Sequence, residues 1–457
     1  MSGNSLRVAV VGSGPAGFYA AGQLLASDAP AVEVDMVERL PTPWGLVRLG
    51  VAPDHPNIKS VSRVFEKIAQ RPGFRFLGNV EVGRDLTHED LVRLYDAVVY
   101  AFGAQTDRRL GIPGEDLPGS WPATAFVAWY NGHPDFQALE FDLSHERAVV
   151  VGNGNVAVDV ARMLALTEEE LVSTDTTDPA IAAIVGAGVR EIVMLGRRGP
   201  AQAAFTTPEL QELGELAGAD VVVDPAELEL DPASAAAAES DSHARRNLEV
   251  LRQYAERPRS GKPRSIHLRF RVSPVAILGE ERVEAVEVVR NELVADERGQ
   301  VRAVATDERE TIPCGIVLRS VGYHGVRLPG APFDEGPGTI PNRGGRVIAE
   351  SGAPLAGVYC SGWIKRGRSG VIGTNKKDAA ETVDLLLEDA REGRLPEPRS
   401  GSAADVDALL VERGVDAVSY AGWEAIDATE RARGEPHGRP RIKLCSWEEL
   451  LDATRAS

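Results

Sequence analysis

The sequence predicts an α/β protein with two parallel-sheet domains, the first of which is interrupted in the chain by the second. Apolar runs of strand length alternate with helical patterns, as is typical of parallel sheets covered by helices. Glycine-rich turns follow two of these runs and lie about one domain length apart, from Gly12 to Gly152. The 457 residues also exceed the length at which a single core keeps growing.

Composition and charge narrow the classes of function. The formal net charge of −18 argues against wholesale nucleic-acid binding. The three cysteines, Cys314, Cys360 and Cys445, are too far apart for a disulfide framework, an iron–sulfur cluster or a zinc ligand pair, so we predict buried thiols and no metal site. The apolar run Val8–Val11 is too short for a signal peptide or a membrane span, so we expect a cytoplasmic protein without membrane insertion.

The first glycine motif, Gly12-Ser-Gly14-Pro-Ala-Gly17, has a strand–turn–helix context. The expected elements are a strand over 6–12, a helix over 16–25 and a strand over 32–38. Gly12 permits the tight turn, Gly14 lets a pyrophosphate approach the backbone, and Gly17 lets the helix pack close on the strand. The helix start supplies N–H donors and partial positive charge for the phosphates. Glu38 at the second strand end would accept ribose hydroxyls and repel a 2′-phosphate, so this module suits FAD or NAD.

The second motif, GNGNVA over 152–157, has the same context but the opposite charge at the next strand tip. The expected elements are a strand over 148–152, a helix from 155 to about 166 and a strand over 191–195. Arg197 and Arg198 follow that last strand and would bind a 2′-phosphate bidentately; a solvated basic strand end is the alternative. The contrast with Glu38 predicts two Rossmann-like dinucleotide-binding domains, with FAD in the first and NADPH in the second.

Strands that end in glycine set the predicted domain boundaries. Strands over 95–104 and 316–322 are expected to carry the chain between the domains, and a strand over 357–362 to return to the first sheet. The predicted FAD-binding domain is then discontinuous in sequence. The predicted domains are an FAD-binding domain of 1–105 and 325–399, an NADPH-binding domain of 106–324 and a C-terminal extension of 400–457 packed on the FAD domain.

The secondary structure of the other segments is predicted from weaker sequence patterns. These segments are helices over 57–69 and 375–386, a surface excursion over 231–242, a loop over 257–264, an antiparallel meander over 266–305, a linker over 396–403 and tail helices over 405–413 and 447–453. The N-terminus of the helix over 375–386 is expected to face the flavin. We assign no chemistry to the tail.

Several longer motifs resemble those of adrenodoxin-reductase-type ferredoxin–NADP⁺ reductases, especially the actinobacterial members. The motifs are GSGPAG over 12–17, LPTPWGLVR over 40–48, GVAPDHP over 50–56, GNGNVAVD over 152–159, GRRGP over 196–200, AFTT over 204–207 and GWIKRGRSGVIGTN over 362–375. PWGLVR and VAPDHP are specific, since a generic dinucleotide fold needs neither. The resemblance implies an FAD-dependent oxidoreductase that transfers hydride from NADPH to FAD and then single electrons to a ferredoxin-like iron–sulfur protein.

The resemblance also implies roles for individual residues. With the three glycines of the first turn, the positions that line FAD are Ala16, Glu38, Leu46, Val82, Trp363, Gly370, Val371 and Ile372. The positions that contact NADPH or NADP⁺ are Asn153, Gly154, Asn155, Val156, Arg197, Arg198 and Glu209, with Gly370 also meeting NADPH. The positions tied to catalysis are His55, Glu212 and Asp159.

Hydride transfer needs the nicotinamide stacked on the flavin with water excluded. Trp363 offers a flat face for that stack, although an ordinary core tryptophan is the alternative. His55 would orient the flavin edge rather than act as a base, because hydride transfer abstracts no proton, or it would simply start a helix. Glu209 lies in the first turn of a helix expected to have Thr207 as its N-cap, so complementing the helix dipole is its alternative role.

An acidic electron-transfer partner would dock on basic residues near the FAD cleft. The candidates are Arg245, Arg246, Arg252, Lys365, Arg366 and Arg368, for which a solvated helix face is the alternative. Other functions remain open. A disulfide reductase would need a redox cysteine pair, and a glutamate-synthase-like flavin subunit usually carries an N-terminal cysteine-rich cluster domain. A flavin monooxygenase and a non-catalytic nucleotide sensor are the remaining alternatives.

Overall fold

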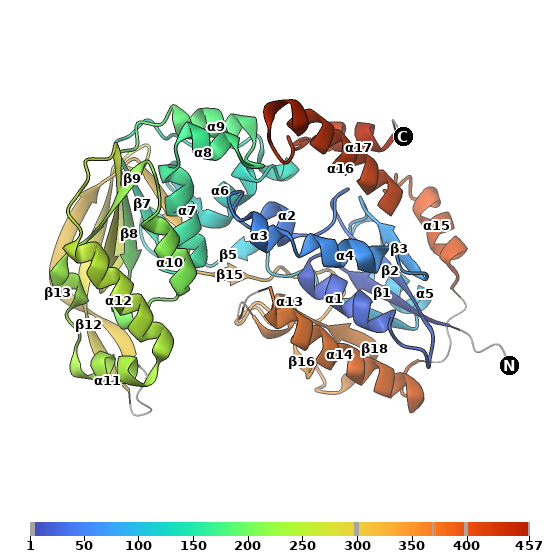
Figure 1. The fold of residues 1–457 in the computed structure, drawn as a ribbon. Helices are drawn as coiled ribbons and strands as arrows, with labels where there is room; N and C mark the ends of the chain where they lie inside the picture. The colour runs from blue at the N-terminus through green and yellow to red at the C-terminus, as the bar shows by residue number, and fades with distance from the viewer. Residues whose placement is uncertain (1–4, 297–300, 368–369, 371, 397–400, 456–457) are drawn as a thin grey trace. The chain divides into compact units, whose positions relative to one another are not determined.

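The computed structural model describes residues 5–296, 301–367, 370, 372–396 and 401–455. It consists of two compact units (Figure 1). Unit 1 contains the chain up to Thr106 and again from Tyr323, and unit 2 contains Asp107–Gly322. The short strands at the two crossings, β5 (Thr106–Asp107) and β15 (Tyr323–His324), pair with each other. Both units have the predicted α/β class.

Unit 1 is built on a seven-stranded sheet in the order β16-β17-β18-β4-β1-β2-β3. Its strands are β1 (Leu6–Val11), β2 (Val32–Val37), β3 (Phe74–Leu77), β4 (Ala97–Tyr100), β16 (Asn342–Arg343), β17 (Arg346–Ile348) and β18 (Pro354–Cys360). The five strands from β18 to β3 run parallel, and β16 and β17 are antiparallel additions. Because β18 pairs with β4, the prediction of a strand that returns to the first sheet is confirmed.

Helices cover both faces of this sheet. The helices of unit 1 are α1 (Pro15–Leu24), α2 (Leu46–Leu49), α3 (Pro56–Lys59), α4 (Ser62–Ala69), α5 (His88–Leu94), α13 (Trp363–Arg366), α14 (Thr374–Arg391), α15 (Ala403–Glu412), α16 (Tyr420–Gly434) and α17 (Trp447–Arg455). Helices α1 and α14 lie side by side (Figure 1). Val8 and Val10 of β1 join the core cluster on their face, and Ala9 and Val11 join the cluster on the other. A parallel strand buried on both sides therefore has the continuous apolar run seen in the sequence.

Unit 2 contains a six-stranded parallel sheet in the order β6-β14-β7-β8-β10-β9 and a separate antiparallel sheet, β11-β12-β13. The strands are β6 (Ser120–Pro122), β7 (Arg147–Val151), β8 (Glu191–Gly196), β9 (Ala219–Val223), β10 (Arg264–Phe270), β11 (Val272–Leu278), β12 (Ala285–Ala295), β13 (Val301–Pro313) and β14 (Ile316–Arg319). The main helices are α6 (Ala123–Tyr130), α7 (Asn155–Ala165), α8 (Glu168–Val172), α9 (Asp178–Val185), α10 (Thr207–Leu213), α11 (Pro232–Ser240) and α12 (Ser242–Glu256).

One of the weaker predictions in unit 2 was wrong, and another was incomplete. The meander expected over 266–305 is formed by β11, β12 and β13 alone, whereas β10 joins the parallel sheet between β8 and β9. The surface excursion expected over 231–242 is the helix α11. The Asp231 carboxylate caps this helix by accepting from the Ser234 N–H at 3.0 Å, and its run of alanines has high helix propensity.

One prediction in unit 1 was also wrong, and another was incomplete. The single helix expected over 57–69 is divided into α3 and α4, with a tight turn at Ser60 whose hydroxyl donates to the Asn57 carbonyl at 2.6 Å. The tail contains α16 in addition to the two predicted helices, and part of the linker expected over 396–403 lies outside the described residues. No helix in the described ranges is long and apolar enough to cross a membrane. The cytoplasmic location stays a prediction.

Candidate dinucleotide-binding sites

The β1–α1 turn of unit 1 is packed closely at two of its glycines and open at the third. Gly12 has a φ of +102°, and a Cβ on it would lie 2.6 Å from the Cα of Phe102. A Cβ on Gly17 would lie 2.0 Å from the Gly12 carbonyl oxygen, so α1 can approach β1 only with glycine here. A Cβ on Gly14 would meet no described atom within 4 Å. The backbone at Gly14 is therefore accessible to a ligand, as a pyrophosphate site requires.

Helices α1 and α7 begin without a side-chain cap. Gly14 and Gly154 occupy their N-cap positions and contribute no side-chain hydrogen bond. By contrast, α5, α8 and α15 each carry a complete capping box. Unsatisfied N–H groups and the helix dipole attract anions, so the two glycine-started helices fit phosphate binding better than these three.

Glu38 is fixed at the tip of β2 against the glycine turn. Its Oε2 accepts hydrogen bonds from the Ser13 backbone N–H at 3.0 Å and from the Ser13 hydroxyl at 2.7 Å. Its Oε1 accepts from the Leu40 N–H at 3.1 Å. The Val80 N–H donates to the Glu38 carbonyl at 3.0 Å, which brings the segment of Val82 to the same strand tip. The carboxylate is thus held where an adenosine ribose in this fold would meet it.

The returning segment brings Trp363 to the same turn. Gly362 has a φ of +78°, and a Cβ on it would lie 2.6 Å from the Cβ of Ala16. The buried carboxylate of Asp378 accepts from the Gly362 N–H at 2.5 Å and fixes this approach. The indole Nε1 of Trp363 is buried and has no hydrogen-bond partner among the described residues. Since a buried donor without an acceptor is costly, this N–H is a candidate ligand contact.

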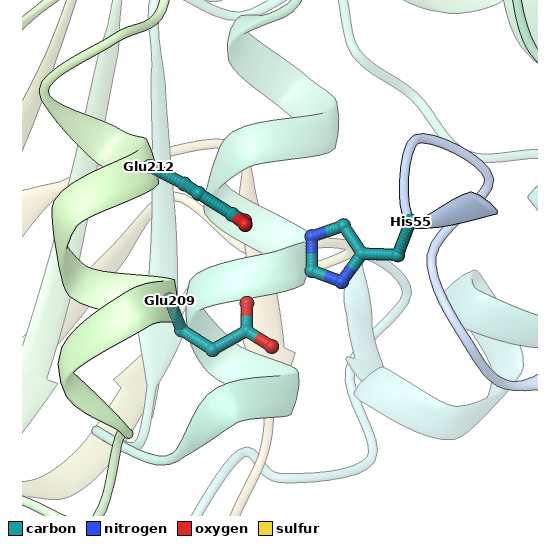
Figure 2. Close-up of side chains that lie close together, drawn as sticks. All are labelled: His55, Glu209 and Glu212. Carbon is teal, nitrogen blue, oxygen red and sulfur yellow. The ribbon is translucent and has the colours of Figure 1, made fainter. Parts of the chain in front are cut away.

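The other residues predicted for the FAD side also lie in unit 1. Leu46 begins α2, and His55 is the buried N-cap residue of α3 (Figure 2). Gly370 has a φ of +80°, and Ile372 packs on the core cluster that contains residues of α1. Val371 lies outside the described residues. The N-terminus of α14 was predicted to face the flavin. Gly373 occupies the N-cap position of α14 without a side-chain hydrogen bond, which partly supports that prediction.

In unit 2, the β7–α7 turn is closed by the loop that leads to α10. Gly152 has a φ of +138°, and a Cβ on it would lie 2.3 Å from the Ser320 carbonyl oxygen. The Ala204 N–H donates to the Asn153 carbonyl at 3.0 Å. The Asn155 side-chain oxygen accepts from the Thr206 N–H at 2.8 Å. These bonds connect the glycine turn to the start of α10, where Glu209 and Glu212 lie. Val156, next along α7, packs against the core of unit 2.

Arg197 and Arg198 follow β8 as two adjacent cations. Arg197 is exposed and Arg198 is half-buried. Burial, and then repulsion from the Arg197 guanidinium, lowers the pKa of Arg198. No ion pair of either side chain is seen in the part of the chain that the structure describes. Arg198 lines an open hollow of about 470 Å³, together with Ala201, Gln202, Ala237, Asp241, Ala244, Val301 and Arg302. Two uncompensated guanidiniums fit a dianionic phosphate.

A buried arginine joins the three acidic residues singled out in unit 2. Arg162 of α7 is only 2% exposed. It lies 2.8 Å from Asp159 Oδ1, 3.3 Å from Glu209 Oε2 and 3.4 Å from Glu212 Oε2. Figure 2 shows that Glu209 and Glu212 project from the same side of α10. The spacing Asp159–Arg162 was a signal for this contact, but the sequence reasoning did not single out Arg162.

The start of α10 differs by one residue from the prediction. Thr206, not Thr207, occupies the N-cap position, and no side chain caps this helix. The Thr207 hydroxyl instead donates to the Asn247 side-chain oxygen at 2.7 Å. With Thr206 as the N-cap residue, Glu209 is the third residue of α10 and still lies in its first turn, where its charge complements the helix dipole.

The predicted basic dock is divided between two environments. Arg245, Arg246 and Arg252 are exposed on α12. The Lys365 side chain, however, is 8% exposed, and its Nζ lies 2.9 Å from the Asp378 carboxylate. Arg366 donates to the Asn375 side-chain oxygen at 2.8 Å. Lys365 and Arg366 are therefore paired with Asp378 and Asn375 inside unit 1. The prediction that these two residues belong to an exposed dock was wrong. Arg368 lies outside the described residues.

The cysteines have environments that disfavour thiolate chemistry. Burial raises the pKa of the Cys314 thiol and of the Cys445 thiol to about 12. Burial also raises the pKa of Cys360. A redox or nucleophilic cysteine works as the thiolate, which these thiols do not form at neutral pH.

Comparison with known proteins agrees with this geometry. A family model described as pyridine nucleotide-disulphide oxidoreductase matches residues 6–194. The NADPH-ferredoxin reductase FprA of Mycobacterium tuberculosis (strain ATCC 25618 / H37Rv) is 54% identical over 456 residues, covering 97% of this chain and 98% of that protein. NADPH:adrenodoxin oxidoreductase, mitochondrial, of Arabidopsis thaliana is 40% identical over 465 residues, covering 99% and 96%. The structure of Mycobacterium tuberculosis FprA in complex with NADPH matches with a TM-score of 0.93 at 51% identity, covering 99% of this chain and 100% of that one.

The fold and the two glycine turns define a protein of the pyridine nucleotide-disulphide oxidoreductase fold with two dinucleotide-binding domains. Within that class, the chain belongs to the adrenodoxin-reductase-type ferredoxin–NADP⁺ reductase family.

Proposed function

We propose that this protein is an NADPH–ferredoxin reductase that binds FAD in unit 1 and NADPH in unit 2. The observation that carries the assignment is the opposite charge at two equivalent strand tips. A hydrogen-bonded carboxylate, Glu38, follows β2, whereas Arg197 and Arg198 follow β8 without a carboxylate partner in the described residues. A carboxylate selects a free ribose diol, and guanidiniums select a 2′-phosphate.

The residues of unit 1 fit FAD. The open backbone at Gly14 and the uncapped start of α1 would hold the pyrophosphate, and Glu38 would hold the ribose. Trp363, with its buried unpaired indole N–H, would lie at the isoalloxazine, and His55 would orient the flavin edge. When bound, the flavin accepts a hydride and passes on single electrons. The remaining positions proposed to line FAD are Gly12, Ala16, Gly17, Leu46, Val82, Gly370, Val371 and Ile372.

The residues of unit 2 would hold NADPH. The pyrophosphate would meet the start of α7 from Asn153 to Val156, and the 2′-phosphate would meet Arg197 and Arg198. Glu209 would contact the nucleotide. We propose that Glu212 and Asp159 act with Glu209 at the nicotinamide end of the nucleotide. Their negative charges would stabilise the nicotinamide ring, which gains positive charge when it loses hydride.

Anaerobic titration tests the function. Stoichiometric NADPH should bleach the flavin absorbance, NADH should do so much less readily, and added ferredoxin should restore the absorbance as it becomes reduced. A colourless protein, or one whose flavin does not respond to NADPH, would refute the assignment. A reduced flavin that reoxidises only with oxygen and a small organic substrate would favour the monooxygenase instead.

We further propose that the partner is an acidic ferredoxin-like protein that docks on the exposed arginines of α12, Arg245, Arg246 and Arg252. Long-range attraction between opposite charges is screened by salt. The ferredoxin reduction rate should therefore fall several-fold as ionic strength rises from about 0.01 M to about 0.3 M, across which the Debye length shrinks several-fold. The rate with ferricyanide, a small acceptor that needs no such dock, is the control.

Replacing all three arginines by glutamine should reduce both the ferredoxin rate at low salt and its salt dependence. A flat salt profile for the unchanged protein would contradict electrostatic docking. An unchanged profile in the triple variant would place the dock elsewhere.

A further inference from the structure

The C-terminal extension contributes a fully buried carboxylate to unit 1. Glu430 of α16 has no solvent exposure. Arg48 of α2 donates to both of its oxygens, at 2.9 and 2.5 Å, in a bidentate pair. Arg441 donates to the same carboxylate at 3.0 Å, and the Leu444 N–H donates at 2.9 Å. A buried charge with this many donors fixes the position of the segment that supplies them.

Arg48 belongs to a segment whose backbone is strained. Trp44 has a φ of +83° and is followed by Gly45 with a φ of +51°. A positive φ at a bulky residue is rare and persists only where the surrounding structure imposes it. The Trp44 ring meets the ring of Trp423 from α16 edge-on, with 4.8 Å between centroids. The Arg48 guanidinium also lies over Trp423, 5.2 Å from its centroid. Helix α16 therefore contacts this strained segment at both Trp44 and Arg48.

The strained segment lies directly on the first glycine turn. The Trp44 N–H donates to the Ser13 carbonyl at 3.0 Å. A Cβ on Gly45 would lie 3.0 Å from the Cα of Gly14. The buried indole Nε1 of Trp44 has no hydrogen-bond partner in the described part of unit 1. The segment thus contacts, through its backbone, the turn that fits a pyrophosphate, and it also carries a buried indole donor without a described partner.

We propose that α16 is part of the FAD site, with Glu430 and Trp423 as positioning residues that hold Trp44–Leu49 against the β1–α1 turn and so control how slowly FAD is released. The inference rests on the proposed binding of FAD in unit 1. It assigns the C-terminal extension a role in cofactor retention. Glu430 and Trp423 act through Arg48 and Trp44.

The test is the rate of FAD release from purified holoenzyme, followed by the rise in free-flavin fluorescence after dilution. Glu430→Gln keeps the shape of the side chain but removes its charge, and should release FAD at least tenfold faster than the unchanged protein. Trp423→Phe weakens both ring contacts and should raise the rate in the same direction. Asp416→Asn is the control, because it removes a charge of the same extension whose side chain is 65% exposed.

NADP⁺ affinity, measured by calorimetry, should be unchanged in all three variants because the nucleotide is assigned to unit 2. Release from both Glu430→Gln and Trp423→Phe at the rate of the Asp416→Asn control would overturn the inference. If Glu430→Gln does not fold, Trp423→Phe decides alone: faster release supports the role of α16, and unchanged release overturns it. An unchanged protein that contains no flavin would instead refute the proposed function.

Discussion

Replacing Arg197 and Arg198 together by glutamine should lower kcat/KM for NADPH by about 100-fold or more and leave kcat/KM for NADH within about twofold. Each charge-assisted hydrogen bond to a phosphate contributes about 1.5–3 kcal/mol, and tenfold in rate corresponds to about 1.4 kcal/mol. Loss of both guanidiniums therefore removes about 3–6 kcal/mol of NADPH binding. NADH lacks the 2′-phosphate and loses none of these bonds.

Steady-state kinetics with ferricyanide as acceptor measures this effect without the ferredoxin dock. The control is the double replacement of Arg257 and Arg259 by glutamine, since both are exposed in the loop after α12 and their loss changes the net charge equally. That variant should keep its preference for NADPH. If the Arg197 and Arg198 variant kept its preference as well, or lost activity equally with both nucleotides, the 2′-phosphate would not lie at this strand tip.

The parts of the site that the sequence predicted are those set by local chemistry. Both glycine turns lie at the expected positions, because close helix–strand packing admits only glycine at Gly17 and the positive φ at Gly12 and Gly152 favours it. In this fold the residue expected at the ribose follows the second strand of the module. Glu38 could therefore be located by its distance from the glycine turn, whereas Arg197 could be located only as the first residue after its strand, because α8 and α9 separate that strand from the turn. No long-range contact was needed for either inference.

The parts that the sequence did not predict depend on contacts between distant residues. Arg48 and Glu430 are 382 positions apart. Arg48 is a single charge in the apolar segment over 46–52, and Glu430 lies in a helix with several other charged residues. Nothing in the local pattern distinguishes a buried ion pair from two exposed charges. Lys365 and Arg366 gave the converse error: they resemble an exposed basic patch, but Asp378 and Asn375 of α14 hold them internally.

Arg162 gives the second large expected effect. Replacing it by methionine should lower the stability of unit 2 by about 3–5 kcal/mol, because removing one partner of a buried ion pair leaves uncompensated charge in the interior. Asp159 and Glu209 are both mostly buried, so their carboxylates cannot recover full hydration. Hydrogen exchange of α7 and α10 measures the change within unit 2, without assuming that the two units unfold together.

The control for this variant is Arg147→Met, which removes the half-exposed pair between Arg147 and Glu191 in the same unit. A partly exposed pair contributes about 0–1 kcal/mol, so exchange in α7 should change little. Adding Asp159→Asn to Arg162→Met should recover part of the lost protection, because it removes one of the stranded charges. Hydrogen exchange in α7 and α10 of Arg162→Met at the rate of the Arg147→Met control would contradict this prediction. The Arg162 guanidinium would then not neutralise the acidic cluster, and another group would have to balance the charges of Glu209 and Glu212.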